Sequence, residues 1–226
     1  MPKYLGVNEK GEALYLGVKM NKDPETGKDT TPAKDAEGNY IEEATTDYEN
    51  AYEYNRKESG DILPKVYGGL GTTFAWKGLD FAIQTSFQLG GRIYDQGYSD
   101  LMTTGGTAFS AGHNFHKDIL DAWSEDNTSS NIPRVDFTDK YAASSSDRFY
   151  TSSDYFSIDN ITLGYTLPKS VLSHIGIQGL RFYGSIENVA IFSARKGMDP
   201  RMSLTYVSSS WYTARRTISG GIKLTF

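Results

Sequence analysis

Apolar and polar side chains alternate strictly from residue 79 to residue 89 of this chain, where the sequence reads LDFAIQTSFQL. One side of the run is apolar apart from a threonine: Leu79, Phe81, Ile83, Thr85, Phe87 and Leu89. A period of two residues predicts a β-strand, and this run is about twice the usual strand length of about 5–6 residues. Any fold of this chain must therefore give a long strand two different environments.

The preceding stretch, VYGGLGTTFAW at residues 66–76, shows the same alternation. Only Lys77 and Gly78 separate the two runs, and a two-residue connection predicts a tight hairpin. In that register Trp76 faces Leu79 and Phe74 faces Phe81, apolar against apolar. We therefore predict an antiparallel pair over residues 65–76 and 79–92.

Three further segments predict strands, at residues 154–167, 179–192 and 212–226. In the first of these, Phe156 and Ile158 are out of phase with Ile161 and Leu163. One extra residue near Asp159 would return both apolar pairs to the same face, because an insertion reverses the alternation. We therefore predict a β-bulge at that point.

Long strands with one apolar and one polar face suit two architectures. A soluble sandwich buries the apolar face between sheets, whereas a membrane barrel turns it to lipid around a wet lumen. Crossing the hydrocarbon takes about 9–11 tilted residues, a length that these strands reach. The predicted connections are short at one end, at 77–78 and 168–178, and long at the other, at 93–153 and 193–211. This asymmetry favours an all-β fold: antiparallel transmembrane β-barrel strands with long external loops.

Composition and motifs exclude several other classes. The chain has no Cys, so it is neither a disulfide scaffold nor a thiolate zinc protein, and its net charge of −5 argues against nucleic-acid binding. His113 and His116 form an H-x-x-H beside Asp118 and Asp121, but the surrounding sequence fits a short helix capped by Asn114 better than a metal site. Without a P-loop, dinucleotide fingerprint or nucleophile elbow, we expect neither an enzyme nor a cofactor or metal.

Acidity is concentrated at the beginning of the chain. Residues 1–64 hold 14 of the 28 acidic and 8 of the 23 basic side chains, whereas the remaining residues are nearly neutral. The stretch EALYLGVKM predicts a short strand with Leu14, Leu16 and Val18 on one side, and a loop rich in Asp, Pro and Gly follows it. We expect an acidic external region with a short hairpin at 1–64, before the barrel strands of 65–226.

Four segments, in this order, resemble the C-terminal part of SusC/RagA-type TonB-dependent outer-membrane transporters. They are GLGTTFAWKGLDFAIQTSFQLGGRIYD, ILDAWSEDNTSSNIPR, NITLGYTLP and GMDPR, and the resemblance covers about residues 60–226. It implies a 22-stranded barrel with an N-terminal plug and a TonB box, in the outer membrane of a Gram-negative bacterium. It also implies a SusD-like surface lipoprotein as partner, the TonB complex as energy source, and oligosaccharides or, for some members, peptides as cargo.

This chain departs from that pattern in its length. Five or so strands cannot close a barrel, which needs about eight, and the first residues have no apolar signal-peptide core. We therefore expect a fragment of a larger importer, most simply one for oligosaccharides. The alternatives are a passive or adhesive outer-membrane barrel and a soluble carbohydrate-binding β-sandwich.

Three groups of residues are candidates for function. Aromatic rings on the external loops are candidate substrate contacts, because a flat ring packs against a sugar, although such residues also form interface girdles: Tyr94, Tyr98, Trp123, Tyr206, Trp211 and Tyr212. The predicted lipid-facing residues are Phe74, Trp76, Phe81, Ile83 and Phe87. By the resemblance, Ile222, Leu224 and Phe226 would be the signal that the barrel-assembly machinery reads by strand addition.

Overall fold

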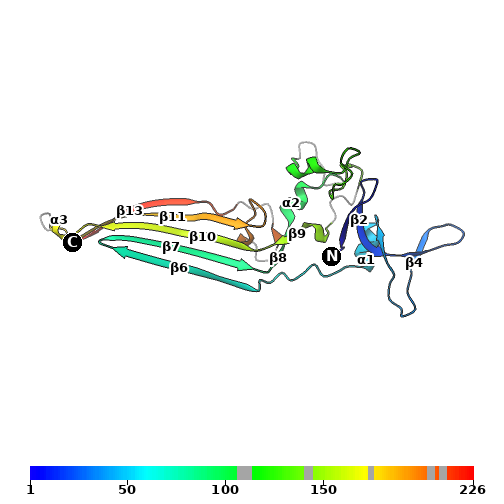
Figure 1. Cartoon of the computed structure of the whole chain (residues 1–226), viewed down its shortest axis with the longest axis horizontal. Helices are drawn as coiled ribbons and strands as arrows, with labels where there is room; N and C mark the ends of the chain where they lie inside the picture. The colour runs from blue at the N-terminus through cyan, green and yellow to red at the C-terminus, as the bar shows by residue number, and fades with distance from the viewer. Residues whose placement is uncertain (106–113, 140–144, 173–175, 203–206, 209–212) are drawn as a thin grey trace. The chain divides into compact units, whose positions relative to one another are not determined.

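The chain divides into two units, each described here by itself. A computed structural model describes residues 1–105, 114–139, 145–172, 176–202, 207–208 and 213–226 (Figure 1). The sheet unit comprises residues 61–93 and 151–226, and the loop unit comprises residues 1–60 and 94–150. The long segment predicted as a loop between strands thus belongs with the acidic N-terminal segment. Nothing in the sequence patterns indicated that association.

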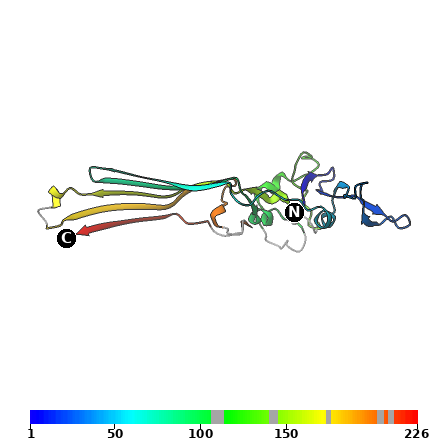
Figure 2. The ribbon, with the colours of Figure 1, turned by 90° about the horizontal axis from the view of Figure 1, so that it is seen from below.

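Five long antiparallel strands make up the sheet unit. They are β6 (Val66–Trp76), β7 (Leu79–Leu89), β10 (Tyr155–Thr166), β11 (Gly179–Ser193) and β13 (Thr217–Thr225). Their order is β13-β11-β10-β7-β6, so β6 and β13 are the edges, and the strands lie side by side in Figures 1 and 2. Smaller elements of this unit are α3 (Lys169–Leu172), β12 (Val207–Ser208) and a 3-10 helix at Pro200–Met202. Two short strands, β8 (Arg92–Asp95) and β9 (Tyr150–Ser152), have residues in both units. The predicted fold class, an open part of an antiparallel barrel, is confirmed.

The β6–β7 hairpin has the predicted register. Trp76 pairs with Leu79, Phe74 with Phe81 and Thr72 with Ile83. Lys77 and Gly78 both adopt positive φ, 46° and 88°, as a two-residue turn must when it matches the right-handed twist of its strands. The hairpin was predictable because its strands and its turn all lie within one short stretch of sequence.

The predicted bulge is also confirmed. The register of β10 against both of its neighbours shifts between Ile158 and Asn160, which leaves Asp159 as the extra residue. The shift keeps Ile158 and Ile161 on one face of the sheet. Asp159 instead accepts a hydrogen bond from the Ser157 hydroxyl at 2.6 Å.

Residues paired across the strands share a face, and they sort the sheet into an apolar and a polar side. One apolar row contains Thr72, Ile83, Ile161, Ile186 and Ile218, and a second contains Trp76, Leu79, Tyr165, Phe182 and Ile222. A polar row contains Gly71, Gln84, Asn160, Glu187 and Thr217. The apolar side is uncovered: Ile218 is 74% exposed and Ile222 62% exposed.

The bulge anchors the segment that follows β11. Arg201 donates to Ser157 Oγ at 2.7 Å and to Asp159 Oδ1 at 3.0 Å. The same guanidinium forms a two-bond pair with the carboxylate of Asp199, at 2.9 and 2.8 Å, and that side chain is 2% exposed. The Asp199-Pro200-Arg201 sequence is therefore explained by its contact with the bulge, about forty residues earlier in the chain.

An ion pair crosses strand β10 on the polar side of the sheet. Arg181 on β11 donates through Nε and Nη2 to Asp80 on β7, with Nε 3.0 Å from Oδ1. The strand between them contributes Gly164 at the crossing point, and a Cβ there would collide with both charged groups. A residue without a side chain is thus required for the pair to form.

The loop unit is built from short elements around two small cores. Its strands are β1 (Tyr4–Val7), β2 (Ala13–Val18), β3 (Met20–Lys22), β4 (Asp29–Pro32) and β5 (Glu42–Thr45), with sheet orders β1-β2-β5 and β3-β4. Its helices are α1 (Tyr48–Tyr54), α2 (Gln96–Leu101) and 3-10 turns at Lys117–Asp121 and Asp147–Phe149. One core contains Ala13, Tyr15 and Ala51, and the other contains Tyr94, Met102 and Phe149. Over the described residues, no helix is both long and apolar enough to cross a bilayer.

The apolar side expected for β2 is buried only in part: Val18 is 2% exposed, but the two leucines on the same side are not buried. Leu14 and Leu16 are half-exposed, whereas Ala13 and Tyr15 are buried. The reason is α1, which begins at the Asp47 cap and packs Ala51 against the Ala13 and Tyr15 side. Asn50 of the same helix accepts from Val18 N at 2.8 Å and donates to Val18 O at 3.0 Å. Helix packing therefore overrode the local pattern.

We expect Gly164→Ala to break the pair between Asp80 and Arg181, because the new methyl group occupies the space of both charged groups. Overpacking of this kind costs about 1–3 kcal/mol. Denaturant unfolding of the full-length protein in detergent measures the loss. The matched control is Gly71→Ala on the same side of the sheet, where the nearest atom to the new Cβ would be 3.7 Å away. Equal stability of the two variants would contradict the assignment.

Candidate functional site

Segment 123–134 is bound to the N-terminal turn of the loop unit. Trp123 N donates to Ile132 O at 2.8 Å, which closes the segment on itself, and the indole ring lies against Gly11. Arg134 N donates to Gly11 O at 2.8 Å, and its guanidinium donates to Lys10 O at 2.8 Å. The Trp123 and Ile132-Pro133-Arg134 positions quoted from the sequence therefore have a structural role in joining two distant segments.

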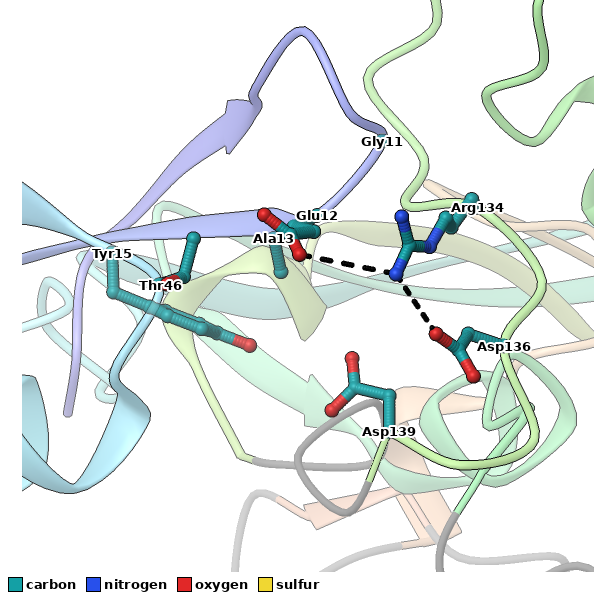
Figure 3. A pocket seen from close by; sticks show the side chains of 8 residues that line it. All are labelled: Gly11, Glu12, Ala13, Tyr15, Thr46, Arg134, Asp136 and Asp139. Atoms are coloured by element: carbon teal, nitrogen blue, oxygen red, sulfur yellow. Dashed lines mark hydrogen bonds and ion pairs between the residues drawn. The ribbon is translucent and has the colours of Figure 1, made fainter.

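A cavity of about 250 Å³ opens beside this junction, and we call it the loop cavity (Figure 3). Strand β2 and the turn before it contribute one wall, and the segment after Pro133 contributes the opposite wall. The lining residues are Gly11, Glu12, Ala13, Tyr15, Thr46, Arg134, Asp136 and Asp139. All of them belong to the loop unit.

Charged groups in the loop cavity are held by a fixed set of contacts. Arg134 lies between two carboxylates, 3.0 Å from Asp136 Oδ2 and 3.8 Å from Glu12 Oε1. The Asp136 carboxylate accepts from the hydroxyl and the backbone N–H of Thr138, and these bonds, with Arg134, lower its pKa to about 2. Asp136 is therefore ionised at any physiological pH.

Tyr15 forms the floor of the loop cavity. It is 4% exposed, and its ring packs edge-on against Tyr4 and Tyr48, with centroids 6.0 and 5.3 Å away. Burial, reinforced by the nearby Asp139 carboxylate, raises the pKa of the Tyr15 phenol well above its usual range. The group at this site is thus a neutral hydroxyl.

The aromatic residues proposed as substrate contacts lie in different places. Tyr94 is buried in a core, with its hydroxyl 3.2 Å from Ser99 Oγ, so the structure does not favour a role in binding. Tyr98 donates to Asp118 Oδ2 at 2.9 Å, and Trp123 belongs to the junction described above. Tyr206, Trp211 and Tyr212 lie outside the described residues. Substrate contact by any of these rings stays a prediction.

The predicted helix cap in the H-x-x-H segment, Asn114, is wrong. The 3-10 helix at Lys117–Asp121 is capped by His116, whose Nδ1 accepts from Asp118 N at 3.2 Å, and Asn114 has no part in it. The helix begins at Lys117, later than the sequence pattern indicated, so the residue before it, His116, is the cap. His113 lies outside the described residues, and the residues that are described contain no cluster of His, Asp or Glu arranged to hold a metal ion.

The remaining candidates lie on the long strands. Phe74, Trp76, Phe81, Ile83 and Phe87 all lie on the apolar side of the sheet, as expected from the alternation. Ile222 and Leu224 are on the same side of β13, and Phe226 follows that strand with 79% exposure. Contact with lipid and reading by the assembly machinery stay predictions.

Sequence reasoning missed the loop cavity. In the sequence Arg134 is only part of a motif, and no pattern distinguishes Tyr15, Asp136 or Asp139 from their neighbours. Their meeting depends on the junction between segments more than a hundred residues apart, which no local pattern encodes. The one available signal was the charged run after Pro133.

Comparison with known proteins relates the chain to one group of receptors. It is 31% identical over 146 residues to the TonB-dependent receptor P3 of Formosa agariphila, covering 65% of this chain and 14% of that receptor. It is 26% identical over 184 residues to the TonB-dependent receptor SusC of Bacteroides thetaiotaomicron, covering 80% of this chain and 17% of SusC. No family model matches the chain. The chain thus spans less than a fifth of the length of these curated relatives.

Solved structures share the fold. The RagAB peptide transporter superposes with a TM-score of 0.75 and 23% identity, covering 100% of this chain and 22% of the other. The RagAB peptide importer in its open-open state gives a TM-score of 0.70 at 22% identity, with the same coverage. Both units of this chain therefore occur together in larger transporter chains.

We expect Arg134→Ala to loosen the junction between segment 123–134 and the turn at residues 8–12. The variant loses the bond to Lys10 O and the pair with Asp136, and we expect backbone amides of both segments to exchange with solvent about tenfold faster. Hydrogen-exchange mass spectrometry of the full-length protein measures this. Lys10→Ala is the control, because it removes a nearby positive charge and keeps the carbonyl that Arg134 binds. Equal exchange in the two variants would show that Arg134 does not hold the junction.

Proposed function

Because the chain belongs to the SusC/RagA type of TonB-dependent receptor, we propose that its sheet unit is part of a barrel wall in the bacterial outer membrane. The observation that supports this is the uncovered apolar side that runs across all five long strands. In water a second layer of protein would have to cover such a face, whereas in a membrane the lipid chains cover it. The polar side, with Gln84, Asn160 and Glu187, would then face a wet lumen.

Strand lengths fit the thickness of a membrane. The five strands have 11, 11, 12, 15 and 9 residues, and a tilted strand crosses the hydrocarbon in about 9–11. Strands β7, β10 and β11 each have a hydrogen-bonded strand on both sides, and β7 pairs with β6 along its whole length. That pairing meets the requirement that no backbone donor or acceptor be left bare in lipid.

The two ends of the sheet differ in a way that suggests an orientation. The turn at Lys77 and Gly78, helix α3 and the C-terminus lie at one end of the sheet in Figure 1. The long connections, which include residues 94–150 of the loop unit, leave from the other end of the strands. Outer-membrane barrels have short periplasmic turns and long extracellular loops, so we place the loop unit outside the cell.

For the whole receptor we propose TonB-dependent import of an oligosaccharide, together with a SusD-like surface lipoprotein. The likeness to SusC supports this, while a solved relative is named a peptide transporter, which makes peptides the alternative cargo. A passive or adhesive barrel is the competing function. It would neither need an energy source nor accumulate its cargo.

Uptake by cells with and without TonB tests the import function. Cells that produce the full-length receptor should accumulate a labelled neutral oligosaccharide, and deletion of TonB should abolish the accumulation. A labelled peptide is supplied in parallel. Accumulation of the peptide alone would show that the cargo is a peptide and not an oligosaccharide. Equal entry of a solute with and without TonB would favour the passive barrel.

We expect Ile83→Arg to destabilise the full-length receptor in lipid by about 2–4 kcal/mol, because Ile83 lies on the apolar side of a central strand. Gln84→Arg is the matched control, since its side chain is the next one along and projects from the polar side. Denaturant unfolding in lipid vesicles and outer-membrane levels measure both variants. Equal tolerance of arginine at the two positions would contradict the barrel.

A further inference from the structure

The apolar side of the sheet is hollowed near the end of the strands that lies opposite the Lys77 and Gly78 turn. A groove of about 580 Å³ opens there, where β7 and β11 end and β10 begins (the strand ends are labelled in Figure 1). We call it the sheet groove, and all of its lining residues belong to the sheet unit. Its apolar lining consists of Phe87, Leu89, Phe156, Phe192 and Ala194.

A glycine paired with a phenylalanine explains the hollow. Phe87 on β7 pairs with Gly68 on β6 and with Phe156 on β10. Its ring leans over the glycine, since a Cβ on Gly68 would lie 3.3 Å from the tip of that ring. On the other side, Phe156 and Phe192 stack with their ring centroids 6.5 Å apart and their planes at 29°. The rings therefore form two groups, and the sheet groove lies between them.

The stacked rings are exposed although they are large and apolar. Phe156 is 42% exposed and Phe192 is 61% exposed, and contiguous bare apolar surface of this kind marks a contact with lipid or with another protein. The sheet groove is continuous with the apolar rows of the transmembrane sheet, because Phe87 and Phe156 lie on the same side as Ile83. The lipid that covers those rows therefore also reaches the sheet groove.

The depth of the sheet groove selects one leaflet of the membrane. Phe87 lies eight residues along β7 from Leu79, which follows the opposite turn. At about 3.3 Å per residue and a tilt of about 40°, Phe87 is about 20 Å from that turn, within an apolar band about 25 Å tall. The turn is on the periplasmic side in the orientation proposed above. The sheet groove therefore lies at the depth of the outer leaflet, close to its head groups.

Two lysines lie near the outer rim of the sheet groove. Lys65 crosses the turn after β7, because a Cβ on Gly90 would be 2.9 Å from Lys65 Cγ. Lys196 is exposed, two positions after the lining residue Ala194. The carboxylate in the lining, on Asp154, accepts from Gly90 N at 2.6 Å. The excess of positive charge favours a lipid with phosphate in its head group, because lysine binds phosphate as a point charge.

We propose that the sheet groove binds an acyl chain of one lipopolysaccharide molecule, the phosphate-bearing lipid of the outer leaflet, with its phosphates near Lys65 and Lys196. This deepens the proposed function and rests on it, since it takes the sheet to be a barrel wall with its long connections outside the cell. Lipid exchanges freely over a smooth apolar face, whereas a chain in a groove contacts protein on several sides. This one lipid is therefore retained when its neighbours exchange.

Dissociation of lipopolysaccharide from the full-length receptor tests the site. The receptor is purified from outer membranes in mild detergent, diluted into excess detergent and followed by native mass spectrometry, and one lipopolysaccharide molecule should outlast the rest. Ala194→Leu fills part of the sheet groove from an exposed position. It should speed the loss of that molecule about 4–15-fold, the equivalent of one or two methylene groups kept out of the groove. The control is Ala190→Leu, on the same side of β11 but outside the lining, which should leave the rate unchanged.

Photo-crosslinking in cells locates the lipid without filling the sheet groove. The photoreactive residue p-benzoylphenylalanine replaces Phe192 in one full-length receptor and Phe182 in another. Both positions are exposed on the apolar side of β11, but Phe182 lies near the opposite end of the strand. Lipopolysaccharide should crosslink at Phe192 and not at Phe182, because the inner leaflet contains phospholipid instead.

Each outcome supports or overturns the site. Equal dissociation rates for Ala194→Leu and Ala190→Leu would overturn it, and would leave the barrel intact if arginine is still tolerated worse at Ile83 than at Gln84. Retention of a phospholipid, or of a second receptor copy in place of lipopolysaccharide, would overturn the assigned occupant. Crosslinking of lipopolysaccharide at Phe182 and not at Phe192 would overturn both the site and the proposed orientation of the barrel.

Discussion

The backbone hydrogen bonds of one five-stranded sheet impose the constraint on which the rest of the sheet unit depends. They hold long strands in a single layer, and no second layer of this chain covers the apolar rows through Ile83 and Tyr165. A face of that kind is stable only against lipid or another protein. The proposed membrane insertion and the proposed polar lumen both rest on this single-layer arrangement.

The polar side of the sheet is stabilised by contacts of a different kind. Arg181 reaches Asp80 over Gly164, and Arg201 joins the bulge at Asp159 to Asp199. Each guanidinium connects segments that strand pairing alone does not join. Charged pairs on this side are compatible with a wet lumen, whereas the apolar side contains none among the paired rows. The charged pairs of this sheet thus lie only on the polar side, where water is expected.

The loop unit depends on junctions and not on a large core. Beside its two small cores, hydrogen bonds from Arg134 to the backbone carbonyls of Lys10 and Gly11 join segment 123–134 to the turn before β2. Such a scaffold leaves a polar cavity at the junction, and the same arginine both holds the junction and lines the cavity.

Local sequence patterns are enough to predict the five long strands, the β6–β7 register, the bulge at Asp159 and the two faces of the sheet. These follow from the alternation of neighbouring side chains, which is a local property of the chain. Packing between distant segments sets the burial of Ala13 and Tyr15 on β2, the cap of the helix at Lys117, and the cavity that Tyr15, Arg134 and Asp139 share. Those outcomes depend on contacts between segments far apart in the chain, such as Asp80 and Arg181 at a separation of 101 residues. The alternation of apolar and polar residues does not predict such contacts, because they form only when the strands and helices pack together.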